Sequence, residues 1–242
     1  MTTVVVVAEP PVEDCVPKLL PPEVDAGTDS ELYAAMLADV CTAIQHGEGD
    51  VLINYPTAED RPVDDPQELL ADALAGAVPR PEDVRYEVQV GETDSGIAGN
   101  ALSHLLETEE EPTVGVAAPT ALFLRREHVG NVAMQLRSHE VVVGPAPNGR
   151  VYFAGFREAI DFEDAFAAPA VESVTERGRE ADRSVSFLPM TPVFEEPSDY
   201  ETVGSLLRAR MRAGRLVPEQ TAALFEEWGR LDGQGGDGSD NS

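Results

Sequence analysis

The sequence predicts an α/β protein of three layers, in which helices cover both faces of a mostly parallel sheet. Short apolar runs rich in β-branched residues, typical of buried strands, alternate with longer amphipathic segments up to residue 136. The chain has 242 residues, 42% of them hydrophobic, which is enough for one sizeable core. We therefore expect a single domain over residues 1–231 and a disordered, acidic, glycine-rich tail over 232–242.

The strands are predicted from apolar runs that end at turn residues. Val4–Val7 is the first, and it stops at a Glu-Pro-Pro turn. The other strands are expected at residues 51–55, 84–90, 113–117, 140–144, 151–156 and 184–188. The runs on either side of residues 145–150 are too close together for a helical crossover, so they predict a strand–turn–strand unit.

The helices are predicted from apolar residues at helical spacing together with start and stop signals. Asp29 or Ser30 is expected to cap the first helix, and Gly47 to end it. Asp94 or Ser95 is expected to cap the third. The predicted helices cover residues 29–47, 66–77, 94–106, 121–136, 170–180, 200–213 and 218–231.

The charge balance is strongly acidic. Forty-five Asp and Glu residues against 17 Lys and Arg give a net charge of −28, and Lys18 is the sole lysine. This composition predicts a halophile's cytosol, where molar salt screens self-repulsion; an acidic protein of an ordinary cytosol is the alternative. It argues against binding to nucleic acid or to anionic membranes. Because no apolar run approaches the ~20 residues of a membrane span and no signal peptide is recognisable, we expect a cytoplasmic protein.

In a parallel α/β sheet, ligands bind at the carboxyl ends of strands. Four segments are expected there: Ala8–Leu20, Gly91–Gly96, Ala117–Leu122 and Gly144–Arg150. The first lacks the glycine patterns of phosphate-binding loops, and its one cation, Lys18, lies among acidic residues, so it is a candidate anion contact or only a surface loop. The second either directs backbone N–H groups around Asp94 and Gly96 at an anion or is an ordinary capping loop.

The sequence offers few other catalytic or metal-binding patterns. Its four histidines lack zinc spacing, no Gly-x-Ser-x-Gly motif occurs, and Cys15 is expected to be inert because acidic neighbours raise its pKa. Glu195, Glu196 and Asp199 form a carboxylate cluster after the last strand. Such a cluster is either a site for Mg²⁺ or Mn²⁺ or a solvated surface group.

These segments, in this order, resemble motifs of a small bacterial and archaeal glycosyltransferase-A-type family, a DUF-class relative of the nucleotide-diphospho-sugar transferases. Residues 9–20 resemble its K-P-P-x-x-G-x-V-K-T-R-L loop, with both prolines, Val16 and Leu20 matching. Residues 89–99 resemble its Q-x-x-G-D-L-G-E-R-M segment, with Asp94 and Gly96 matching. Further likenesses are residues 115–119 to G-x-D-x-P, 144–153 to G-P-A-x-D-G-G-Y-Y-L, and 195–200 to D-T-P-E-D-L.

The resemblance covers residues 3–207 and leaves a C-terminal helix pair, from about residue 208, outside it. It implies a glycosyltransferase-A fold and a nucleotide whose phosphates are neutralised by a carboxylate-held divalent ion and by basic side chains of the first loop. This chain departs from that pattern. Ala117 stands where the metal-binding aspartate is expected, and Glu9 replaces a cation. In the turn, Asn148 replaces an acid and Arg150 a glycine.

Two functional hypotheses follow. The first is a diverged haloarchaeal member without metal-dependent transferase activity or cofactor, acting as a binding or regulatory module whose protein partner is open. The alternative is an active nucleotide-sugar or nucleotidyl transferase with a rearranged site. In it, Arg150, Asn148 and Lys18 contact the nucleotide, and Asp94, Glu195 or Asp199 holds Mg²⁺ or Mn²⁺. A nucleotide or nucleotide sugar is the candidate ligand; no catalytic residue is assigned. The candidate ligand-binding residues are Lys18, Asp94, Gly96, Asn148, Gly149 and Arg150.

Overall fold

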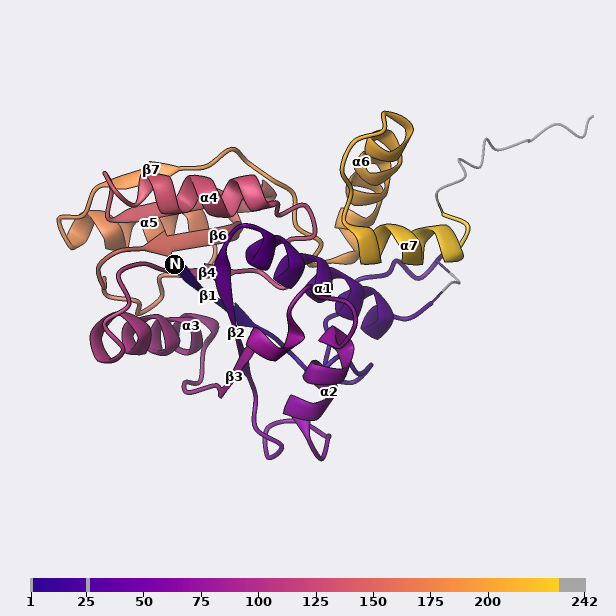
Figure 1. Cartoon of the computed structure of the whole chain (residues 1–242), viewed down its shortest axis with the longest axis horizontal. Coiled ribbons are helices and arrows are strands. Elements are labelled where there is room, and N and C mark those ends of the chain that lie inside the picture. The colour runs from indigo at the N-terminus through magenta and orange to yellow at the C-terminus, as the bar shows by residue number, and fades with distance from the viewer. Residues whose placement is uncertain (1, 25–26, 231–242) are drawn as a thin grey trace, which may run out of the picture.

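The protein is built around a seven-stranded sheet with the order β3–β2–β1–β4–β6–β5–β7 (Figure 1). The computed structural model describes residues 2–24 and 27–230. Strand β6 runs antiparallel to β4 and β5, and every other neighbouring pair is parallel. The mostly parallel sheet and the strand–turn–strand unit are therefore confirmed. The strands are β1 (Thr2–Val7), β2 (Gly49–Tyr55), β3 (Arg85–Val88), β4 (Val114–Ala117), β5 (Val141–Pro145), β6 (Val151–Phe156) and β7 (Val185–Phe187).

Helices cover both faces of this sheet, as the sequence predicts. Val6 of β1 is buried among residues of α1, α2, α4, α6 and α7, whereas Val5 is buried on the opposite face with residues of α3 and α5. This alternation is what a central parallel strand requires, because its successive side chains point to opposite faces. The helices are α1 (Asp29–His46), α2 (Pro66–Leu74), α3 (Asp94–Ser103), α4 (Arg126–Gln135), α5 (Ala170–Glu180), α6 (Tyr200–Arg212) and α7 (Glu219–Glu227).

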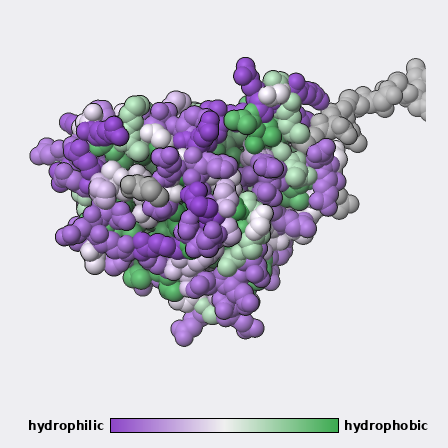
Figure 2. Space-filling view, in the orientation of Figure 1, coloured by the Kyte–Doolittle hydropathy of each residue, from purple (hydrophilic) through white to green (hydrophobic). Residues whose placement is uncertain are grey.

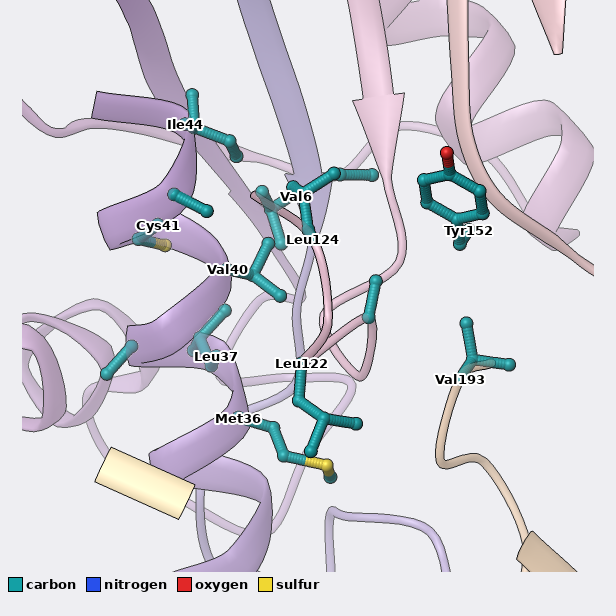
Figure 3. Close-up of a cluster of buried hydrophobic side chains, with 14 of the residues drawn as sticks. Val6, Met36, Leu37, Val40, Cys41, Ile44, Leu122, Leu124, Tyr152 and Val193 are labelled. Atoms are coloured by element: carbon teal, nitrogen blue, oxygen red, sulfur yellow. The ribbon is translucent and has the colours of Figure 1, made fainter. Parts of the chain in front are cut away.

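Helix α1 packs its apolar face against β1 and the segment that follows β4. Leu37, Val40 and Ile44 recur at helical spacing and are fully buried, and they point toward Val6 and Leu124 (Figure 3). Burying each such side chain contributes about 1.5–3 kcal/mol. These buried contacts hold α1 in place against the sheet, and they thereby fix where the two ends of the helix lie.

The predicted helix caps are wrong by one or two residues. Thr28 caps α1 in a capping box: its hydroxyl accepts the N–H of Glu31 at 3.2 Å, and the Glu31 carboxylate accepts the N–H of Thr28 at 2.9 Å. Thr93 caps α3 by accepting the N–H of Gly96. In both cases the threonine has extended backbone angles, which a cap requires, while the acids named as caps already lie in the first helical turn.

The helix predicted over 121–136 is wrong in its first turn. Residues 121–124 form turns in which all four side chains are buried, and α4 begins only at Arg126. A helix at the surface buries one face, so it cannot bury four successive side chains; an irregular segment pressed against α1 can. The shift leaves Arg125 and Arg126 at the start of the helix.

The segment after β7 returns along the carboxyl edge of the sheet. The N–H of Thr191 donates to the carbonyl of Pro145 at 3.0 Å, and the N–H of Phe194 donates to that of Thr120 at 3.2 Å. This path brings residues 195–199 beside the turn between β5 and β6. Helix α6 then starts at Tyr200, which confirms the helix predicted over 200–213 and means that the C-terminal pair begins before residue 208. Helices α6 and α7 lie at one end of the molecule (Figure 1).

Hydrophilic residues cover most of the face seen in Figure 2, and apolar residues show through next to α6 and α7. Within residues 2–24 and 27–230, no helix has the length and apolar character needed to cross a membrane. The tail predicted over 232–242 lies outside the described residues.

Candidate functional site

The turn between β5 and β6 is anchored by an ion pair between Arg150 and Asp199. The two terminal guanidinium nitrogens of Arg150 each donate to one carboxylate oxygen of Asp199, both at 2.7 Å. The Arg150 Nε donates to the carbonyl of Pro147 at 3.0 Å. Because both side chains are less than one-fifth exposed, this bidentate pair is shielded from water. Together with the bond to Pro147 it engages three of the five N–H donors of Arg150.

Two more carboxylates lie near the same guanidinium. Glu195 Oε2 is 3.6 Å and Glu196 Oε1 is 4.0 Å from a terminal nitrogen of Arg150. Burial alone would raise the pKa of Asp199, but the hydrogen bonds from Arg150 and from the N–H of Glu195 hold it below its usual value. Burial raises the pKa of Glu195, and Arg150 opposes that shift. The cluster that the sequence singles out is thus organised around an arginine.

These carboxylates do not fit a divalent cation as they are arranged. Both oxygens of Asp199 accept from Arg150, and Oδ2 also accepts the N–H of Glu195 at 3.0 Å and of Glu196 at 3.2 Å. A metal ion would have to displace the guanidinium. Among residues 2–24 and 27–230, no three His, Cys, Asp or Glu side chains are grouped so as to hold a metal ion.

Lys18, the cation of the first loop, is also paired within the chain. Its Nζ donates to Asp29 at 2.8 Å and to Glu13 at 2.9 Å. Asp29 in turn accepts the N–H groups of Leu19 and Leu20. Hydrogen bonds to Asp29 and Glu13 raise the pKa of Lys18, so it stays charged, but two carboxylates already neutralise that charge.

The entrance to the first loop carries a second ion pair, which the sequence did not indicate. Arg61, from the loop after β2, pairs with Glu9 through its Nε and a terminal nitrogen. Glu9 stands where the resembled family has a cation. Arg61 brings a positive charge to this place, but Glu9 neutralises it, so the pair carries no net charge. Nothing in the spacing of residues 9 and 61 signals the contact, because it depends on β1 and β2 being neighbours.

The Gly91–Gly96 segment forms a tight turn at the start of α3. The N–H of Gly96 donates to Thr93 Oγ1 at 3.0 Å, and that of Ile97 to the Thr93 carbonyl at 2.8 Å. Gly91 has a φ of +137°, and a Cβ there would lie 2.8 Å from the Ile97 nitrogen. The chain itself therefore covers these donors. Asp94 is exposed in the first turn.

The remaining two candidates, Asn148 and Gly149, shape the turn rather than line a cleft. Asn148 is exposed with a φ of +62°, and Gly149 has a φ of +75°. A Cβ on Gly149 would lie 2.7 Å from Cβ of Pro169, so the glycine lets the turn pack closely against the start of α5. The structure thus brings Arg150 together with Glu195 and Asp199, and it leaves Lys18 and Asp94 in separate surroundings.

The other departures from the resembled motifs are also structural. Ala117 is 1% exposed and packs in the core on the α1 side, so its methyl group replaces a polar ligand with apolar contact. Burial is the main cause of the raised pKa of Cys15, and the charge of Glu9 adds to it. This agrees with the expectation that the thiol is a poor nucleophile.

Comparison with known proteins assigns the fold: the chain has a nucleotide-diphospho-sugar transferase fold. A structure from Desulfovibrio desulfuricans G20, described as a candidate nucleotide-diphospho-sugar transferase, aligns with a TM-score of 0.70 at 20% identity over 96% of this chain and 97% of that chain. A cytidylyltransferase from Leptospira borgpetersenii serovar Hardjo-bovis aligns with a TM-score of 0.51 at 10% identity over 96% of each chain. No protein-family model matches the sequence, and neither does any curated protein.

Proposed function

We propose that the chain is a diverged, cytoplasmic protein with a nucleotide-diphospho-sugar transferase fold that does not catalyse metal-dependent transfer and acts as a binding or regulatory module. The bidentate pair of Arg150 and Asp199 carries this proposal. In transfer chemistry, electrostatic stabilisation of the phosphates is usually the largest contribution, and it needs cations that face the ligand. At this edge Arg150 faces a carboxylate of its own chain.

Two further observations support the proposal. Lys18 is shared by Glu13 and Asp29, so a phosphate at the first loop would compete with both carboxylates. Ala117 is buried where the resembled family has its metal-binding aspartate. A transferase acting here would need three local rearrangements, at Arg150, Lys18 and the metal site, before it could hold a nucleotide diphosphate and its cation.

The alternative is an active transferase in which ligand binding opens the Arg150–Asp199 pair. Thermal unfolding in molar KCl, with and without UDP, GDP, CTP and nucleotide sugars in the presence of Mn²⁺, distinguishes the two. A ligand that binds the folded protein at 100 times its Kd adds about 2.7 kcal/mol of stability. We expect no nucleotide-induced shift that depends on Arg150. A saturable shift that Arg150→Gln abolishes would show that a nucleotide binds at this edge and would support the alternative.

We also propose that the protein works at molar salt. A net charge of −28 on 242 residues makes self-repulsion in the folded state large, and salt shortens the Debye length to about 3 Å at 1 M. The free energy of unfolding should rise steeply between low and molar KCl. A flat dependence on KCl would contradict this part of the proposal and leave the nucleotide experiment intact.

A further inference from the structure

A cleft on the helical side of the molecule is lined by three arginines, one of which, Arg126, pairs with Glu127. It lies among the second half of α1, the turns before α4, and the junction of α6 with α7, and it has a volume of about 380 Å³. The arginines that line it are Arg125, Arg126 and Arg210. Since α1 begins beside the first loop and this cleft uses its later residues, such as His46, the cleft is separate from the carboxyl edge.

The acids that also line this cleft are largely committed elsewhere. Asp39 accepts the N–H groups of Gln220 and Thr221 and the Thr221 hydroxyl, all within 2.9 Å, and so caps the start of α7. Glu127 pairs with the Nε of Arg126 at 3.3 Å. Glu219 is the remaining carboxylate in the lining, and it lies beyond ion-pair distance of the arginines there.

Arg125 and Arg210 are therefore the uncommitted cations of the cleft. Within residues 2–24 and 27–230, neither side chain makes an ion pair or a hydrogen bond. Arg210 Cζ lies 4.4 Å from the centre of the Phe123 ring, a cation–π contact that places the guanidinium against an aromatic residue of the lining. Burial lowers the pKa of Arg210, and the like charge of Arg125 adds to the effect.

Most of the remaining lining is apolar, and Thr42 and His46 are its polar members. Leu122, Phe123 and Leu124 are buried in the turns before α4, and Leu216 and Val217 stand at the junction of α6 and α7. Leu216 is 74% exposed, so it offers the lining an accessible apolar side chain. A cleft of this volume is within the range of small-molecule sites.

We propose that this cleft binds a small organic anion, with its phosphate or carboxylate group held between Arg125 and Arg210 and its apolar part against Leu122 and Leu216. Two guanidinium groups that line the same cleft can share one anion, and they offer the fork geometry that phosphate and carboxylate oxygens accept. The inference goes beyond the proposed function, because it concerns a second site remote from the sheet edge.

Titration calorimetry on the full chain tests it with four probes. Phenyl phosphate and benzoate combine an anion with a ring, inorganic phosphate is the anion alone, and benzyl alcohol is the apolar part alone. We expect at least one aryl anion to bind more tightly than both single-feature probes, and the tighter of the two identifies the headgroup. Measurements at the lowest KCl concentration that keeps the protein folded limit screening of the charges.

Arg210→Gln should weaken aryl-anion binding about tenfold or more, since each factor of ten is about 1.4 kcal/mol. Arg212→Gln is the matched control: it removes the same charge from the same helix at an exposed position outside the cleft lining, and it should leave binding unchanged. Arg125→Gln repeats the test on a different element. Absence of binding by both aryl anions, or equal losses in Arg210→Gln and Arg212→Gln, would overturn the proposal without touching the nucleotide experiment.

Discussion

Replacing Asp199 by asparagine should destabilise the protein by about 2–3 kcal/mol. The substitution keeps the shape of the side chain and removes the charge that Arg150 meets in two hydrogen bonds of 2.7 Å. Hydrogen bonds to charged groups contribute about 1.5–3 kcal/mol, and stranding one member of a buried pair costs about 3–5 kcal/mol. Because the Glu195 carboxylate remains 3.6 Å from the guanidinium and partly compensates its charge, we expect a loss of stability below the cost of about 3–5 kcal/mol for a fully stranded charge.

A double-mutant cycle measures the pair itself. Urea unfolding of the wild type, Arg150→Gln, Asp199→Asn and the double variant should give a coupling of about 1–2 kcal/mol. The control cycle uses the exposed pair of Arg126 and Glu127, whose side chains are 68% and 48% exposed. Exposed pairs couple by about 0–1 kcal/mol. Equal coupling in the two cycles would refute the view that the Arg150–Asp199 pair is a shielded, structural interaction.

The same variant should also change the response to acid. The pKa of Asp199 is lower in the folded protein than in the unfolded chain, where it is about 3.9. Its contribution is therefore complete above the unfolded pKa and is lost as the pH falls through the folded pKa. The difference in unfolding free energy between wild type and Asp199→Asn should narrow below about pH 4. A difference that grows on acidification would show that the sign is wrong.

Three further experiments test the local arguments. Gly149→Ala should lower the free energy of unfolding by about 1–2 kcal/mol or more, because Gly149 has a positive φ and lies close to Pro169. Gly130→Ala, at an exposed helical position with open space, should raise it by about 0.5–1 kcal/mol. Thermal unfolding of the two variants compares these effects. Asp39→Ala should cost about 2–4 kcal/mol and loosen α7, seen as faster amide exchange in that helix. Burial raises the pKa of Cys41 to about 12, so a thiol reagent should modify Cys15 first and Cys41 only on unfolding.

The sequence predicts the layers of this fold well because hydrophobic periodicity reports burial. Val4–Val7 is apolar at every position, and the strand is indeed covered on both faces. The same rule fails over residues 121–124, where an apolar run predicts the first turn of a helix but the chain forms buried turns. Hydrophobic periodicity distinguishes a helix or strand with one buried face from a fully exposed segment. It does not distinguish a buried helical turn from an irregular segment that is buried on all sides.

The candidate site could be predicted only as a set of segments. Parallel topology places strand ends at one edge, which is why Arg150 and Glu195 were both candidates. Whether an arginine faces a ligand or a carboxylate depends on the path of residues 189–196, which backbone hydrogen bonds such as Thr191 to Pro145 determine. The pairing of Arg61 with Glu9 depends in the same way on which strands are adjacent. These contacts are long-range, and no local pattern encodes them.

The distribution of uncommitted positive charge separates the two regions. At the carboxyl edge, Lys18, Arg61 and Arg150 each hold a carboxylate of the same chain, so an incoming phosphate would break an existing ion pair for every one it forms. In the cleft lined by α1, the turns before α4 and the junction of α6 with α7, Arg125 and Arg210 have no such partner among residues 2–24 and 27–230. An anion bound there would therefore displace only water and counterions. The chain has 45 acidic residues, yet the two arginines in this concave, partly apolar site have no carboxylate partner among the described residues. This difference in ion pairing is why we propose ligand binding at the cleft and a structural role for the charged residues of the edge.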